Sequence, residues 1–167
     1  MLDHRQDFLS DEWASAPGAS PLERRARPES AHRRAIDRLA LELRAEEGLL
    51  CRFHSGLVDS TPKEVLARGT RCRVDLEQSR RIEGRRVVPD LTVRCARTDR
   101  LFFVIEVWHS HAVDACKRKA FEAGSIPWLE VRSLHVIWRR RGQALPVLDW
   151  GGFGGPAPCQ GPLAAEG

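Results

Sequence analysis

Two acidic residues and one lysine stand near the ends of expected secondary-structure elements, in positions suited to binding a metal ion. Asp90 directly follows Pro89, Glu106 ends the apolar run 102–105, and Lys117 lies in the helix-like segment that comes next. Carboxylate oxygens are ligands that Mg²⁺ prefers, and a bound cation can polarise a phosphoryl group and activate a water molecule. These residue types therefore indicate phosphate-ester hydrolysis.

The segments that carry the two acids predict a β-hairpin. Residues 85–95 are rich in β-branched side chains, residues 101–107 form a second apolar run, and the Arg-Thr-Asp-Arg sequence at 97–100 is typical of a turn. Folding about this turn brings Asp90 and Glu106 to the same end of the sheet. The carbonyl of Val107, beside Glu106, is a candidate third ligand.

The pairing register of this hairpin decides whether the two acids share a face. Directly opposed residues of an antiparallel pair have numbers with a constant sum. If Arg97 pairs with Arg100 the sum is 197, whereas Asp90 and Glu106 require 196. We therefore expect a three-residue loop, or a bulge near Pro89, which cannot donate a ladder hydrogen bond.

Glu106 and Lys117 also fit purely structural roles. Glu106 suits a strand that simply emerges into water, with Trp108 covering the edge of the core. Lys117 falls within an expected apolar stripe of the helix, formed by Val113, Cys116, Ala120 and Phe121. A lysine there either extends its stem along apolar surface or brings a cation to the two carboxylates.

A helix is expected between residue 28 and Gly48. His32, Ile36, Leu39 and Leu43 recur at spacings of four, three and four and so share one face. Glu29 lies one turn before His32 on that face. An acid in a first turn commonly complements the helix dipole, and a histidine there is more often structural than a ligand.

The remaining pattern predicts an α/β domain with a mixed sheet flanked by helices. A half-buried strand is expected at 72–78, a helix at 110–124 with Ser110 as its cap and Gly124 as its stop, and one or two strands within 127–132 and 134–138. The order is helix, three strands, helix, strand. We expect a domain over 28–140, a flexible arm at 1–27 and a flexible Gly/Pro-rich tail at 141–167.

Composition narrows the class of protein only modestly. A net charge of +4 with clustered arginines suits a polyanionic partner, and equally an ordinary soluble protein. Five cysteines without a CxxC pair favour a reducing cytoplasm, and no apolar stretch approaches the length of a membrane span. The chain has no G-x-S-x-G, phosphate-binding glycine loop or HExxH motif, which disfavours other hydrolases and transferases.

The ordered set of motifs resembles a nuclease superfamily. Pro89-Asp90 followed by Glu106, in an αβββαβ frame, resembles the PD-(D/E)xK nucleases. More narrowly, EVWHSHAVDACK at 106–117 followed by SIPWLEV at 125–131 looks like the nuclease-like domain of competence CoiA-like proteins. The resemblance covers about residues 28–133 and implies a restriction-endonuclease-like fold.

The resemblance also implies roles for individual residues. Asp90 and Glu106 would bind Mg²⁺ or Mn²⁺, with Glu29 as a helper, and His111 would contact phosphate or serve as a structural histidine near the helix cap. The family's lysine two positions after the glutamate is Trp108 here, and an indole neither carries a cation nor ligates metal. Lys117, on the following helix, would be its substitute.

Two functions follow from this interpretation. The first is a cytoplasmic, Mg²⁺-dependent nuclease that hydrolyses phosphodiester bonds in DNA. The second is a catalytically degenerate module of the same fold that binds nucleic acid or a protein partner, and the presence of Trp108 favours it.

Overall fold

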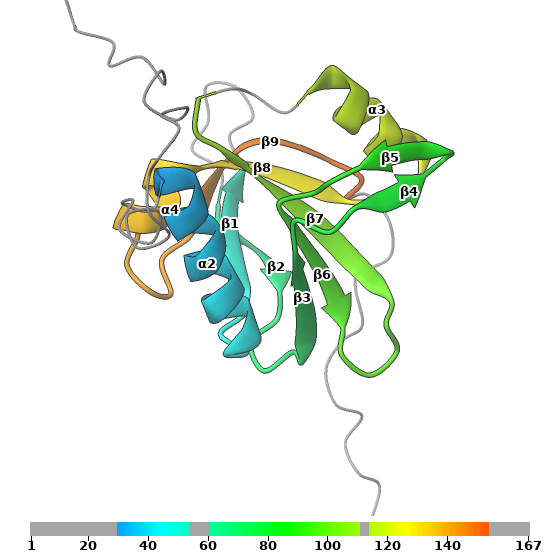
Figure 1. Ribbon diagram of the computed structural model, residues 1–167. Coiled ribbons are helices and arrows are strands. Elements are labelled where there is room, and N and C mark those ends of the chain that lie inside the picture. The colour runs from blue at the N-terminus through cyan, green and yellow to red at the C-terminus, as the bar shows by residue number, and fades with distance from the viewer. Residues whose placement is uncertain (1–29, 54–60, 111–113, 154–167) are drawn as a thin grey trace, which may run out of the picture.

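The computed structural model describes residues 30–53, 61–110 and 114–153 (Figure 1). Within them the chain forms, in order, α2 Ala31–Arg44, β1 Leu49–Phe53, β2 Lys63–Leu66, β3 Cys72–Leu76, β4 Arg80–Ile82, β5 Arg85–Val87, β6 Leu91–Cys95, β7 Leu101–Trp108, α3 Ala115–Ala123, β8 Trp128–Arg132, α4 Ser133–Trp138 and β9 Leu145–Gly151. The predicted arm at 1–27 lies outside these residues.

Most of the strands belong to one mixed sheet of seven strands in the order β2-β1-β9-β8-β7-β6-β3. β7 is parallel to β8 and β1 is parallel to β9, whereas the other neighbouring pairs are antiparallel. β4 and β5 form a separate antiparallel pair. The expectation of an α/β protein with a mixed sheet and packed helices is confirmed.

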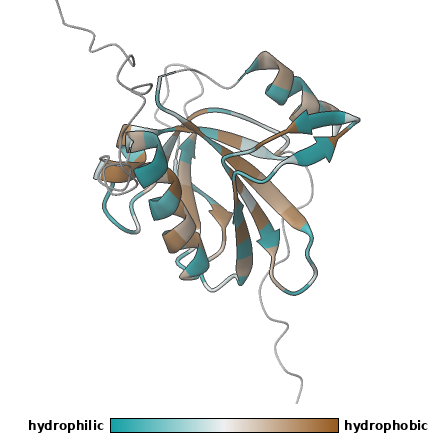
Figure 2. Cartoon of the chain, in the orientation of Figure 1, coloured by the Kyte–Doolittle hydropathy of each residue, from teal (hydrophilic) through white to brown (hydrophobic). Residues whose placement is uncertain are grey.

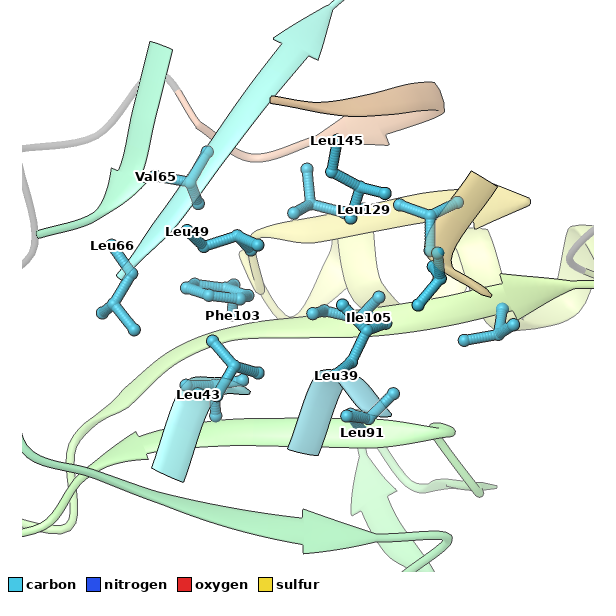
Figure 3. Close-up of a cluster of buried hydrophobic side chains, with 14 of the residues drawn as sticks. Leu39, Leu43, Leu49, Val65, Leu66, Leu91, Phe103, Ile105, Leu129 and Leu145 are labelled. Atoms are coloured by element: carbon cyan, nitrogen blue, oxygen red, sulfur yellow. The ribbon is translucent and has the colours of Figure 1, made fainter. Parts of the chain in front are cut away.

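The first helix, α2, forms as predicted and buries its apolar face. Ser30 caps α2 by accepting a hydrogen bond from the backbone N–H of Arg33, and the helix ends at Arg44, earlier than expected. Ile36, Leu39 and Leu43 are fully buried because this stripe packs against the sheet. Figure 3 shows Leu39 and Leu43 pointing toward Phe103 and Ile105 of β7.

Apolar side chains cover both faces of β7. The larger cluster lies between α2, α4 and one face, and it includes Ile105 and Val107. A smaller cluster on the other face joins Val104 to Phe121 of α3, Trp128 of β8 and the β4–β5 pair. Figure 2 shows hydrophobic residues along the central strands, while the β4–β5 pair is mainly hydrophilic.

Two expectations about the C-terminal part of the chain are wrong. Residues 134–138 belong to helix α4 rather than to a strand. Residues 145–151 are β9, a strand between β1 and β8, so the domain does not end at 140 and this segment is not a flexible tail. Pro146 is accommodated because pairing with β8 begins only at Val147.

The predicted strand at 85–95 is divided by Pro89. Residues 85–87 form β5, residues 91–95 form β6, and Pro89 lies in the connection between them. β6 begins only after the proline because proline cannot donate to a ladder. The division lets β5 pack near α3 while β6 joins the large sheet.

The second helix begins later than expected. Asp114, not Ser110, caps α3, and its carboxylate accepts a hydrogen bond from the N–H of Cys116. The predicted stop at Gly124 is confirmed. Ala120 and Phe121 are buried, but Cys116 is exposed and so lies off the apolar stripe, while Val113 lies outside the described residues.

No helix in the described ranges is both long and apolar enough to cross a membrane.

Candidate metal and phosphate site

The β6–β7 register brings Asp90 and Glu106 to the same end of the sheet. Leu91 pairs with Ile105, and the next position in this register sets Asp90 opposite Glu106. The predicted loop is wrong: residues 96–100 connect the strands, and the bulge lies between Val93 and Arg94 rather than near Pro89. The bulge corrects the register by one residue, which gives the required sum.

Asp90 is held by contacts with two different elements. Its Oδ2 accepts a hydrogen bond of 2.7 Å from the backbone N–H of Val107. The same oxygen lies 3.2 Å from Nε2 of His32, near the start of α2. Val107 therefore meets Asp90 through its N–H, whereas its predicted role used its carbonyl oxygen.

Glu106 is a buried carboxylate, and one of its two oxygens has no hydrogen-bond partner among the described residues. Only 4% of the residue is exposed. Its Oε2 accepts a hydrogen bond of 2.7 Å from Nζ of Lys117 on α3, and its Oε1 is buried without a hydrogen-bond partner among the described residues. Buried polar atoms are rarely left unpaired, so Oε1 is available for a further positive or hydrogen-bonding group.

The surroundings of Glu106 favour its protonated form. Burial is the main cause that raises the pKa of this carboxyl, from 4.5 to about 7, and the charges of Asp90 and Glu130 act in the same direction. The cation and hydrogen bond of Lys117 lower the pKa, but by less. A further cation beside Glu106 would therefore stabilise its charged form.

A row of acids that the sequence interpretation missed continues along the sheet. Glu106 pairs in register with Glu130 of β8, which pairs with Asp149 of β9. Arg118, which follows Lys117 on α3, contacts Glu130 at 3.2 Å and Asp149 at 2.7 Å. Two consecutive basic residues of one helix thus pair with acids from three neighbouring strands.

The sequence favours surface or strand-end positions for two further acids, Glu130 and Glu77. Glu130 is buried, with 3% exposed, so that expectation is wrong. Its position in a run of apolar residues was a signal that it faces the interior. Glu77 fits the expectation: it is exposed and pairs with Arg33 at 2.7 Å.

Trp108, at the end of β7, contacts a cation from the neighbouring strand. Trp108 pairs in register with Arg132 of β8. The guanidinium carbon of Arg132 lies 4.3 Å from the centroid of the indole ring. The edge of the site therefore carries a stacked arginine beside the tryptophan.

Two of the predicted site residues, Glu29 and His111, lie outside the described residues.

The residues present fit a divalent cation bound mainly by oxygen. Among the described residues, no group of three or more His, Cys, Asp or Glu side chains is arranged to hold a metal ion by itself. Mg²⁺, however, commonly binds one or two carboxylates and completes its shell with water and substrate phosphate. Asp90 and the unpartnered Oε1 of Glu106 meet that smaller requirement.

No family model, no curated protein and no solved structure matches the chain. The interpretation of the site therefore depends on its own geometry and on the motifs in the sequence.

Proposed function

We propose that this protein is a cytoplasmic, metal-dependent nuclease that hydrolyses phosphodiester bonds in DNA. The observation that carries the proposal is the buried Glu106 carboxylate, which is paired with Lys117 through one oxygen and has no hydrogen-bond partner on the other among the described residues. Asp90 lies near enough to raise the pKa of Glu106. Two carboxylates can hold a metal ion that activates water, and a lysine can stabilise the charge that develops on the phosphate.

The order of elements supports a restriction-endonuclease-like core within this fold. The helix α2, the antiparallel strands β3, β6 and β7, the helix α3 and the strand β8 follow the αβββαβ order, with β8 parallel to β7. In this proposal β1, β2 and β9 extend the core on the far side of β8.

Each residue has a distinct role in the proposal. Asp90 and Glu106 bind the cation, with His32 and the Val107 N–H holding Asp90 in place. Lys117 orients the attacking water or stabilises the charge that develops on the phosphate. When bound, Mg²⁺ or Mn²⁺ supplies charge neutralisation at the phosphate and lowers the pKa of a water molecule.

Cleavage of plasmid and single-stranded DNA with Mg²⁺ or Mn²⁺ tests this function. Asp90→Asn, Glu106→Gln and Lys117→Met should each lower the cleavage rate at least about 100-fold, the scale of a lost acid, base or electrostatic group. Lys119→Met is the matched control, because Lys119 is an exposed lysine on the same helix.

Metal binding provides a second measurement that does not depend on turnover. Mg²⁺ or Mn²⁺ should raise the melting temperature of the wild type and of Lys119→Met, because a ligand that binds only the folded state stabilises it. Asp90→Asn and Glu106→Gln should abolish the rise. Equal cleavage by the wild type and all three site variants would refute the assignment.

The contact of Trp108 with Arg132 favours one second candidate, a module that binds nucleic acid without cleaving it. In that case the wild type binds DNA in a salt-sensitive manner but shows no cleavage. Trp108→Lys, which restores the superfamily's lysine, would then be the variant that gains activity.

A further inference from the structure

Arg132 is a half-buried arginine whose cation is held by an aromatic ring. Its guanidinium carbon lies 4.3 Å from the Trp108 ring centroid, within the range of a cation–π contact. The pairing of Trp108 with Arg132 across the parallel β7 and β8 strands fixes both residues at the ends of those strands. The arginine is therefore positioned by the sheet.

Arg132 differs from several other arginines that lie partly in the interior. Arg80 contacts Asp75, Arg118 contacts Glu130 and Asp149, and Arg139 contacts Glu42. Within the described ranges Arg132 has no carboxylate partner, and its Nε atom is buried without a hydrogen bond. Its positive charge is not neutralised by these residues.

The strand geometry directs this charge to the face that carries the acids. Trp108 and Arg132 follow Glu106 and Glu130 by two residues on the same two strands. Side chains two residues apart point to the same face and are roughly 7 Å apart along a strand. Arg132 and Trp108 thus extend the acidic row of Glu106 and Glu130 toward the strand ends.

We propose that Arg132, held against Trp108, binds a backbone phosphate of DNA and guides that strand to the carboxylates of Asp90 and Glu106. The identity of the ligand rests on the proposed function, while the cation and its position do not. A planar guanidinium binds phosphate oxygens through two parallel hydrogen bonds and can stack on an aromatic face at the same time. Trp108 then does not replace the missing lysine but supports a cation supplied by the next strand.

The test is the salt dependence of binding to a labelled DNA duplex, measured by fluorescence anisotropy in EDTA so that no cleavage occurs. Arg132→Gln should weaken binding on the order of tenfold at low salt and reduce the slope of log affinity against log salt by about one. Arg97→Gln is the matched control, because Arg97 is an exposed arginine in the connection at the far end of the β6–β7 hairpin. It should leave both values unchanged.

Two further variants separate the effect of the Arg132 charge from that of the Trp108 ring that supports it. Arg132→Lys should keep the salt slope but lose affinity, because the charge remains while the planar fork is lost. Trp108→Leu should likewise keep the slope and weaken binding, because the cation remains without its aromatic support. Both also stand in for Arg132→Gln if that variant does not fold, which circular dichroism and thermal melting report.

A salt slope for Arg132→Gln equal to those of the wild type and Arg97→Gln would overturn the inference, as would a wild type that binds no DNA. The cleavage assay tests the proposed nuclease function separately. DNA binding that depends on Arg132 without any cleavage would leave this inference standing and reject the nuclease. Cleavage that depends on Glu106 but not on Arg132 would support the nuclease and reject the role of Arg132.

Discussion

Glu42 and Glu106 are both buried carboxylates, yet they differ in how completely their oxygens are hydrogen-bonded. Glu42 on α2 accepts a hydrogen bond from Arg38 at 3.0 Å on Oε1 and another from Arg139 on Oε2. Arg38 also donates to the backbone carbonyls of Ile137 and Arg139, which ties α2 to the end of α4. Glu106 has Lys117 on one oxygen only among the described residues.

The difference separates a structural acid from a candidate functional one. A buried charge that is fully paired contributes to a fixed geometry and leaves no atom for a ligand. A buried carboxylate with an unpaired oxygen is unfavourable in the charged state, as the raised pKa of Glu106 indicates. Such an unfavourable feature is typical of sites that gain a ligand.

The largest expected effect on stability comes from removing Glu42, the fully paired acid. Glu42→Ala should lower the free energy of unfolding by about 3–5 kcal/mol, because it leaves the buried Arg139 without its carboxylate. Urea denaturation measures the loss. Glu47→Ala is the control, since its contact with the exposed Arg141 at 3.3 Å is worth about 1 kcal/mol or less. Equal losses in the two variants would remove the distinction between a buried and a surface pair.

The effect of Glu106 should instead appear in the pH dependence of the free energy of unfolding. Below pH 4.5 its carboxyl is protonated in both states, but between pH 4.5 and about 7 the unfolded chain releases the proton while the folded protein retains it. Raising the pH across this window therefore favours unfolding, by on the order of 3 kcal/mol in total at Glu106.

Denaturation of the wild type and Glu106→Gln from pH 4 to 8 measures this contribution. The neutral glutamine should remove the decline in stability that Glu106 causes, so the two curves should diverge as the pH rises. Parallel curves would mean that the pKa of Glu106 is not raised in the folded protein.

The smallest expected effect concerns His32. His32→Ala should cost about 0.5–1.5 kcal/mol of stability, the usual worth of one hydrogen bond, because Asp90 keeps its bond from the Val107 N–H. His32→Gln, which retains a donor, should recover part of the loss. A cost as large as that of Glu42→Ala would show that Asp90 is also a structural acid.

Periodicity in the sequence was sufficient to predict the elements that carry the site. The stripe of Ile36, Leu39 and Leu43 predicted α2, and the apolar run ending at Glu106 predicted β7, because each pattern arises from one buried face. The contact of Lys117 with Glu106 follows from the helix that comes after β7.

Other parts depended on contacts between segments far apart in the chain. The place of Glu130 beside Glu106 was missed because the parallel pairing of β7 with β8 cannot be read from the local sequence of either strand. β9 was missed because Pro146 and the following glycines resemble a tail, while the partners that order the strand lie in β1 and β8. The bulge near Arg94 could be anticipated only as a mismatch of register, not located.

The place of β9 has a consequence for how the chain folds during its synthesis. Among the described strands, β1 pairs only with β2 and β9, so β1 and β2 join the rest of the sheet through a segment that is made much later than they are. Until residues 145–151 leave the ribosome, β1 and β8 each expose an unpaired edge that favours aggregation. Completion of the sheet is therefore a late event, and a nascent chain stalled before Leu145 should be a substrate for chaperones.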